Sequence, residues 1–161
     1  SNSSQKVTDK LPINFKWIGL IKSIFPNSTI IHCTRNPKDT CFSIYKNYFV
    51  NSNLDFAYNL TDLCKYYNLY IDLMNHWKKI IPKSIIDVRY ENLVNNPENE
   101  IKKLIKSCKL NWDKNCLNFY NNKRFIKTAS DTQVRKKIYK SSLDSWRNYK
   151  SDLEPVFKNF F

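Results

Sequence analysis

The sequence predicts an α/β chain built around a parallel sheet. Two short runs rich in β-branched residues, 28–34 and 84–89, are separated and followed by segments in which apolar residues recur at helical spacing. Strands that alternate with helices are typical of parallel sheets, whose strands are buried on both faces. With 161 residues, 42% of them hydrophobic, the chain is long enough for one domain with its own core.

Apolar spacing and proline positions predict where the helices lie. Pro26 and Pro82 end two of them, and the triplet Asn96–Pro97–Glu98 starts another, with Asn as the cap and an acid at the positive end of the helix dipole. Residues 123–137 are expected to form an irregular basic loop. The predicted helices cover residues 16–25, 37–50, 61–81, 97–108, 113–120, 141–150 and 153–160.

Two strands are few for such a sheet, since sheets average about five strands. Either further strands lie within residues 7–14, or part of the fold lies outside this chain. The opening Ser1–Asn2 pair looks like the remnant of an expression tag. We therefore expect residues 1–6 to be disordered and residues 7–161 to form the domain.

Charge and glycine content limit the possible ligands. The net charge of +13 favours polyanionic partners: nucleic acid, an acidic membrane surface, a phosphorylated co-substrate or an acidic protein, although general solubility explains many single lysines equally well. The only glycine is Gly19, in an apolar helical pattern, so this sequence holds no glycine-rich phosphate loop.

Cysteine and histidine usage argues against a metal site. The five cysteines are widely spaced, none forms a C-x-x-C pair, and there are two histidines, so reduced thiols and no metal are expected. We see neither a run long enough to span a bilayer nor a signal peptide, so we expect no membrane association and favour a cytoplasmic location.

Arg35 and Ser43 are the first candidates for ligand binding. Arg35 follows the first strand, at the carboxyl edge where α/β sheets bind ligands, and the next helix starts at Pro37. Unpaired N–H groups and the helix dipole suit an anion there, and Ser43 in the second turn could share it. A phosphate would fit. The alternative, in which Arg35 caps a loop or pairs with Asp39 while Ser43 is simply exposed, remains equally open.

Two other stretches carry groups that suit a phosphorylated ligand. Residues 127–146 combine hydroxyl and amide side chains with Arg135, Lys136 and Lys137, which could form a lid or a solvated basic loop. Tyr90 directly follows the second strand and could reach the same crevice or lie in the core. Lys10 precedes a turn held by Pro12, which displays its side chain rigidly.

Taken together, these stretches resemble the sulfotransferase family, and they do so in order from about residue 7 to 160. The nearest branch is that of the tyrosylprotein-like and tetratricopeptide-linked bacterial enzymes. The resemblance rests on Lys10-x-Pro12-x-Asn14-Phe15, Phe25-Pro26, Arg35-Asn36-Pro37-x-Asp39 with Ser43, Tyr90-Glu91-x-Leu93-Val94-x-x-Pro97, Thr128-Ala129-Ser130-x-x-Gln133-Val134-Arg135, Ser142 and Trp146-x-x-Tyr149.

The resemblance implies a P-loop-NTPase-like sulfotransferase fold that moves a sulfuryl group from 3′-phosphoadenosine-5′-phosphosulfate to a hydroxyl acceptor. It implies that Arg35 and Ser43 hold the 3′-phosphate and that Tyr90 contacts the nucleotide. Residues from Ser130 through Arg135 and Lys136 would cover it. Lys10 would be catalytic, stabilising charge on the bridging oxygen of the transferred group.

The sequence also departs from the family pattern. The family's phosphosulfate loop and its catalytic base precede the Lys10 segment, so we expect a truncated sheet that keeps the 3′-phosphate half of the site. His32, inside a strand, is a poor substitute for the base, and Asn47 stands where tyrosylprotein relatives carry a basic residue. We expect little activity from this chain alone unless another segment or a second copy completes it.

Two alternatives stay open. A non-catalytic module for binding a nucleotide or a partner would share the motifs without the transfer step. Nucleic-acid binding through the positive charge is less favoured, because the lysines form no single stripe interleaved with aromatic residues.

Overall fold

A computed structural model describes residues 6–49, 54–122 and 135–161. Strands β1 (Ile30–Thr34) and β2 (Ile85–Arg89) form a two-stranded parallel sheet in which Ile30 aligns with Ile85 and Thr34 with Arg89. The predicted parallel arrangement is therefore confirmed, and helices connect and follow the strands as an α/β chain requires.

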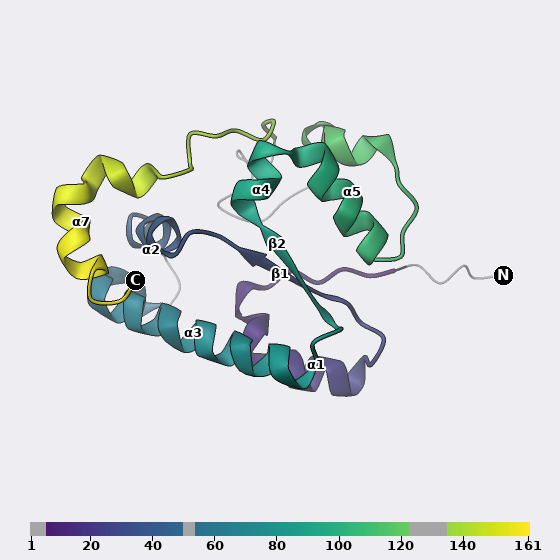
Figure 1. The fold of residues 1–161 in the computed structure, drawn as a ribbon, viewed down its shortest axis with the longest axis horizontal. Helices are drawn as coiled ribbons and strands as arrows, with labels where there is room; N and C mark the ends of the chain where they lie inside the picture. The colour runs from purple at the N-terminus through teal and green to yellow at the C-terminus, as the bar shows by residue number, and fades with distance from the viewer. Residues whose placement is uncertain (1–5, 50–53, 123–134) are drawn as a thin grey trace.

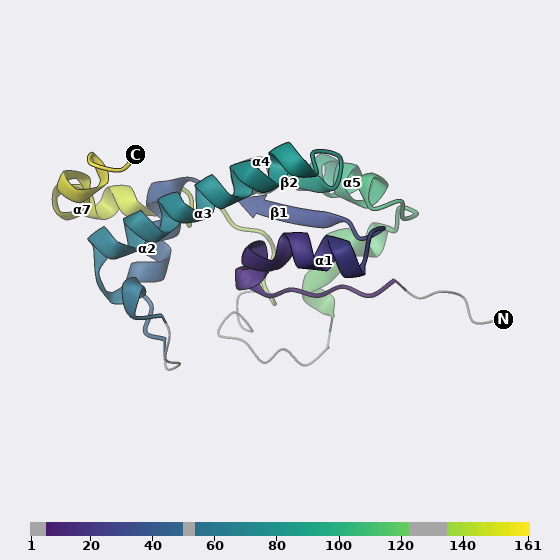
Figure 2. The same cartoon turned by 90° about the horizontal axis from the view of Figure 1, so that it is seen from below.

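Helices surround this small sheet. In Figure 1, α3 runs along one long side of the molecule and α4 and α5 lie on the other, with the strands between them. Figure 2 shows α1 beside β1 and α2 near α7 at the carboxyl-terminal end. The α-helices (α) and 3-10 helices (η) are η1 (Pro12–Trp17), α1 (Ile18–Ile24), α2 (Pro37–Tyr45), η2 (Asp55–Tyr58), α3 (Leu60–Ile80), α4 (Tyr90–Asn95), α5 (Pro97–Ser107), η3 (Lys114–Asn121), η4 (Ser145–Tyr149) and α7 (Lys150–Phe157).

Most predicted helices are confirmed, but several boundaries are wrong. Helix α2 ends at Tyr45, not near residue 50, since the Asn47 side-chain amide donates to the Ser43 carbonyl and competes with a further helical turn. The two helices expected over 141–150 and 153–160 form one continuous segment, η4 followed by α7. The basic loop expected at 123–137 lies mostly outside the described residues.

The idea of a hidden strand within residues 7–14 is wrong. This stretch contains no strand, and the 3-10 helix η1 begins at Pro12, whose fixed φ suits the first position of a helix. The described part of the sheet therefore has two strands.

Burial of β1 on both faces was also expected, and this prediction is wrong for the described residues. His32 is buried against α3 through its contact with Tyr70, whereas Ile31 is 43% exposed and Cys33 is exposed on the opposite face. The apolar run in the sequence indicates two covered faces, but the described elements bury only His32 on one face and leave the opposite face exposed.

The core joins helices α2, α3 and α7. Its seven buried members come from these helices and from η4; they are Cys41, Phe42, Leu63, Cys64, Trp146, Leu153 and Phe157. Carboxyl-terminal residues are thus packed against the helix that follows β1, which fixes the neighbourhood of Arg35.

Gly19 allows a close approach between α1 and α3. A Cβ atom at this position would lie 2.7 Å from the Trp77 ring, closer than side-chain carbons normally come. Trp77 is held in place because its indole nitrogen donates to the carbonyl of Phe15, at 2.9 Å. The single glycine therefore lets α1 pack closely against Trp77 of α3. The hydrogen bond from Trp77 to Phe15 holds the segment that follows Lys10.

Candidate functional site

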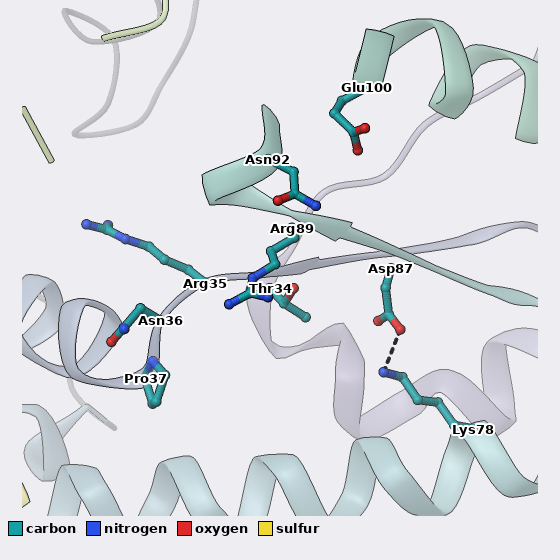
Figure 3. A pocket seen from close by; sticks show the side chains of 9 residues that line it. All are labelled: Thr34, Arg35, Asn36, Pro37, Lys78, Asp87, Arg89, Asn92 and Glu100. Atoms are coloured by element: carbon teal, nitrogen blue, oxygen red, sulfur yellow. Dashed lines mark hydrogen bonds and ion pairs between the residues drawn. The ribbon is translucent and has the colours of Figure 1, made fainter. Parts of the chain in front are cut away.

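An open cleft of about 560 Å³ lies at the carboxyl ends of the two strands. This is the position where α/β sheets bind ligands. Figure 3 shows its lining, which comes from both strands, the start of α2, and helices α3, α4 and α5. The lining residues are Thr34, Arg35, Asn36, Pro37, Lys78, Asp87, Arg89, Asn92 and Glu100.

One wall of the cleft carries a hydrogen-bonded network in which His32 is buried while Asp87 and Lys78 are partly exposed. Asp87 accepts from Lys78 Nζ at 2.7 Å, and its other oxygen lies 2.6 Å from His32 Nδ1, while His32 Nε2 contacts the Tyr70 hydroxyl. Burial lowers the pKa of His32, against the opposing effect of Asp87. Partial burial works to raise the pKa of Asp87, but hydrogen bonds from Lys78 and His32 outweigh it and lower the pKa. These shifts favour a neutral His32 imidazole beside an ionised Asp87 carboxylate.

Arg35 points away from that wall. In Figure 3 its side chain extends away from Asp87 and Lys78. Its guanidinium donates to the Ser142 carbonyl and lies over the Tyr90 ring, 5.1 Å from the centroid. The Nε atom is buried and has no hydrogen-bond partner among the described residues. Among the described residues, Arg35 thus has one donor, Nε, without a partner, next to the cleft.

Tyr90 and Ser142 complete this cluster, which we call the Arg35 cluster (Arg35, Tyr90 and Ser142). The Tyr90 hydroxyl and Ser142 Oγ are 2.7 Å apart. Three segments that are far apart in the sequence therefore meet here: the end of β1, the start of α4 and the stretch before η4. The expectation that Tyr90 reaches the same place as Arg35 agrees with this geometry.

The start of α2 differs from the expectation of unpaired N–H groups. The Asn36 side chain accepts hydrogen bonds from the backbone nitrogens of Lys38 and Asp39, at 2.9 and 3.3 Å. Thr40 N bonds to the Asn36 carbonyl, and Pro37 has no N–H to offer. The first-turn donors are occupied by the cap, so side chains must supply the hydrogen bonds to any anion bound here.

Ser43 lies in α2 and is half-buried. Its hydroxyl makes no hydrogen bond within the described part of the chain, whereas its carbonyl accepts from Asn47. Ser43 follows Asp39 by four residues, so both lie on one side of the helix.

The alternative partner of Arg35, Asp39, also lies nearby, with its Oδ1 at 4.0 Å from Nη2. The two interpretations of Arg35 therefore do not exclude each other: the side chain lies close to Asp39, and its Nε still lacks a partner within the described ranges.

The remaining candidates are not gathered around Arg35 by any described contact. Lys10 is exposed and makes no hydrogen bond or ion pair within the described ranges. Arg135 is half-buried and Lys136 is exposed. Ser130 lies outside the described residues.

Asp39 is the member of this neighbourhood that the sequence did not single out as functional. It is 1% exposed and accepts from Asp144 N, Ser145 Oγ and Trp146 N. Its position four residues after Arg35 on a helix is a signal that places it beside the guanidinium. Its partners, more than 100 residues later, give no such signal.

The fold and site therefore define an α/β chain in which an arginine lies beside a cleft at the carboxyl ends of two parallel strands. The model of the sulfotransferase family matches residues 1–114. An uncharacterized protein of Aquifex aeolicus (strain VF5) is 39% identical over 155 residues, which cover 95% of this chain and 20% of the relative. The chain thus spans about one-fifth of that relative's length. The chain belongs to the sulfotransferase family, as the resemblance predicted.

The described residues contain neither a membrane-spanning helix nor a metal-binding cluster. None of the described helices is both long and apolar enough to cross a membrane. The same residues contain no group of three or more His, Cys, Asp or Glu side chains arranged to hold a metal ion.

Proposed function

We propose that this chain binds the 3′-phosphate of 3′-phosphoadenosine-5′-phosphosulfate and takes part in sulfuryl transfer to a hydroxyl acceptor. The observation that carries the proposal is Arg35, at the carboxyl end of β1 in a chain of the sulfotransferase family, with a buried Nε that lacks a partner among the described residues. A phosphate oxygen would satisfy this donor with a charge-assisted hydrogen bond.

The electrostatics of Arg35 support an anion. The described hydrogen bond of the guanidinium goes to a neutral carbonyl, that of Ser142, and the nearby Asp39 carboxylate already accepts three hydrogen bonds of its own. Asp39, at 4.0 Å, offsets part of the positive charge of Arg35, and the remainder is available to a ligand. Ser43, with a hydroxyl free of described partners, would donate to the same phosphate.

Other residues receive roles from the family resemblance. Tyr90, whose ring already contacts the guanidinium, would lie against the nucleotide. Ser130, Arg135 and Lys136 would cover it. Lys10 would stabilise charge on the bridging oxygen as the sulfur–oxygen bond to the 5′-phosphate breaks and a bond to the acceptor oxygen forms; the acceptor proton leaves to a base that we do not assign.

The proposed architecture is a P-loop-like sulfotransferase domain over residues 7–161 that holds the 3′-phosphate half of the co-substrate site. The single glycine supports this division, because a glycine-rich loop for the 5′-phosphosulfate is not encoded in this sequence. Another segment or polypeptide would supply that half. The same glycine count also favours the second candidate, a nucleotide-binding module without transfer activity.

A thermal shift with 3′-phosphoadenosine-5′-phosphate tests the binding step. Ligand at 100 times its dissociation constant adds about 2.7 kcal/mol to the unfolding free energy, or about 5–10 °C in Tm for a chain of this size. We expect this shift in the wild type and its loss in Arg35→Ala. Lys65→Ala, which removes an exposed positive charge on α3, is the matched control and should keep it. An equal shift in Arg35→Ala would contradict the proposal.

A further inference from the structure

Asp39 is a buried carboxylate with an unusual set of partners. The side chain is 1% exposed, and its oxygens accept from the backbone nitrogen of Asp144 at 2.8 Å, from Ser145 Oγ at 3.2 Å and from the backbone nitrogen of Trp146 at 3.2 Å. Hydrogen bonds to an ionised group are stronger than those between neutral groups, and an unpaired buried charge would be costly. Asp39 therefore fixes residues 144–146 to the first turn of α2.

The same segment supplies the groups that hold the Arg35 cluster together. Ser142, two residues before Asp144, accepts from the guanidinium through its carbonyl and contacts the Tyr90 hydroxyl through its Oγ. Asp144 adopts a left-handed backbone conformation, with φ of 53°, directly after this contact. The hydrogen bond from Asp144 N to Asp39 holds this turn, and with it the position of Ser142.

We propose that Asp39 is a positioning residue for the anion site: it holds residues 142–146 against Arg35 and so sets the direction in which the guanidinium presents its free donor. The inference rests on the proposed function of Arg35. The negative charge of Asp39 and its positioning role have opposite effects on the affinity of the site for an anion. A carboxylate 4.0 Å from Arg35 Nη2 should weaken anion binding by repulsion, whereas a positioning carboxylate strengthens it.

Asp39→Asn separates these two effects. The substitution removes the negative charge, and it replaces at least one acceptor by an amide NH₂ facing a backbone donor. Charge alone predicts tighter binding of 3′-phosphoadenosine-5′-phosphate. Positioning predicts weaker binding and, more specifically, a smaller preference for this ligand over adenosine 5′-phosphate, which lacks the 3′-phosphate.

The measurement is isothermal titration calorimetry with both nucleotides, well below the Tm of each variant. The ratio of interest is the dissociation constant of adenosine 5′-phosphate divided by that of 3′-phosphoadenosine-5′-phosphate. We expect this ratio to fall about tenfold in Asp39→Asn, equivalent to 1.4 kcal/mol. Glu154→Gln is the control, because it removes the charge from the 3.0 Å ion pair between Lys38, at the start of α2, and Glu154, in α7, without touching the Arg35 cluster. It should lower the Tm but leave the ratio unchanged.

Ser145→Ala keeps the test decisive if Asp39→Asn does not fold. It removes one donor to Asp39 and should reduce the ratio about two- to threefold, in line with the loss of one modest hydrogen bond. An unchanged or increased ratio in Asp39→Asn, or in Ser145→Ala when the first variant is unfolded, overturns the inference. If the wild type binds neither nucleotide, the proposed function fails and the inference fails with it.

Discussion

Replacement of Gly19 by alanine sets two opposing effects against each other. The new Cβ would lie 2.7 Å from one carbon of the Trp77 six-membered ring and 2.9 Å from another, so the ring must move by about 0.7 Å to restore ordinary contact. Trp77 resists this movement because its indole donates to the Phe15 carbonyl. Overpacking of this kind costs about 1–3 kcal/mol, whereas alanine gains up to about 1 kcal/mol over glycine inside a helix.

Crowding should therefore win by about 1 kcal/mol, which lowers the Tm by about 2–4 °C in a chain of this length. Differential scanning calorimetry of Gly19→Ala against wild type measures the change. Ser23→Ala, on the exposed side of the same helix, is the control and should change the Tm little. In a Trp77→Phe background, which removes the crowded ring carbons, Gly19→Ala should cost less. A Tm equal to or above that of the wild type for Gly19→Ala would refute the packing argument.

Two further predictions concern stability. The pKa of His32 is lowered from 6.5 by burial, so below pH 6.5 the unfolded chain binds a proton that the folded chain does not, and the unfolding free energy must fall as the pH falls. Urea denaturation between about pH 5 and 6.5 should show this slope in wild type and in the exposed control His76→Gln, and lose it in His32→Gln; an unchanged slope there excludes His32 as its source. Phe157 is fully buried between α2 and α3, so Phe157→Ala should lower the unfolding free energy by about 3–5 kcal/mol in urea titrations. Phe119→Ala, at a 37% exposed position, is the control and should lower it much less. Equal losses of unfolding free energy in the two variants would contradict the assigned core.

Local sequence signals predicted the parts of the site that depend on neighbouring residues. Arg35 and Tyr90 each follow a strand directly, and parallel strands bring their carboxyl ends together, so the contact between the two side chains follows from the strand pattern. Asn36 caps α2 through its side chain; Asn is a strong cap by residue type, but Asn36 was not assigned this role from the sequence. The consequence that its cap removes the free N–H donors was missed.

Contacts between segments that are distant in the sequence could not be predicted from it. The bond from Arg35 to the Ser142 carbonyl spans 107 residues, and a backbone acceptor has no residue-type signature. The open face of β1 was missed for a related reason: an apolar run records that a face is apolar, not which element covers it. The early end of α2 depends on one side chain, Asn47, whose amide competes with the helix backbone.

Recognition of a 3′-phosphate by Arg35 is tested most directly by a titration with two nucleotides. Wild-type chain should bind 3′-phosphoadenosine-5′-phosphate more tightly than adenosine 5′-phosphate, because only the former offers a phosphate to the buried Nε. Arg35→Met keeps a long apolar stem over Tyr90 but removes the donors, and should bind the two nucleotides with nearly equal affinity. A preference of the same size in wild type and Arg35→Met would contradict the central claim.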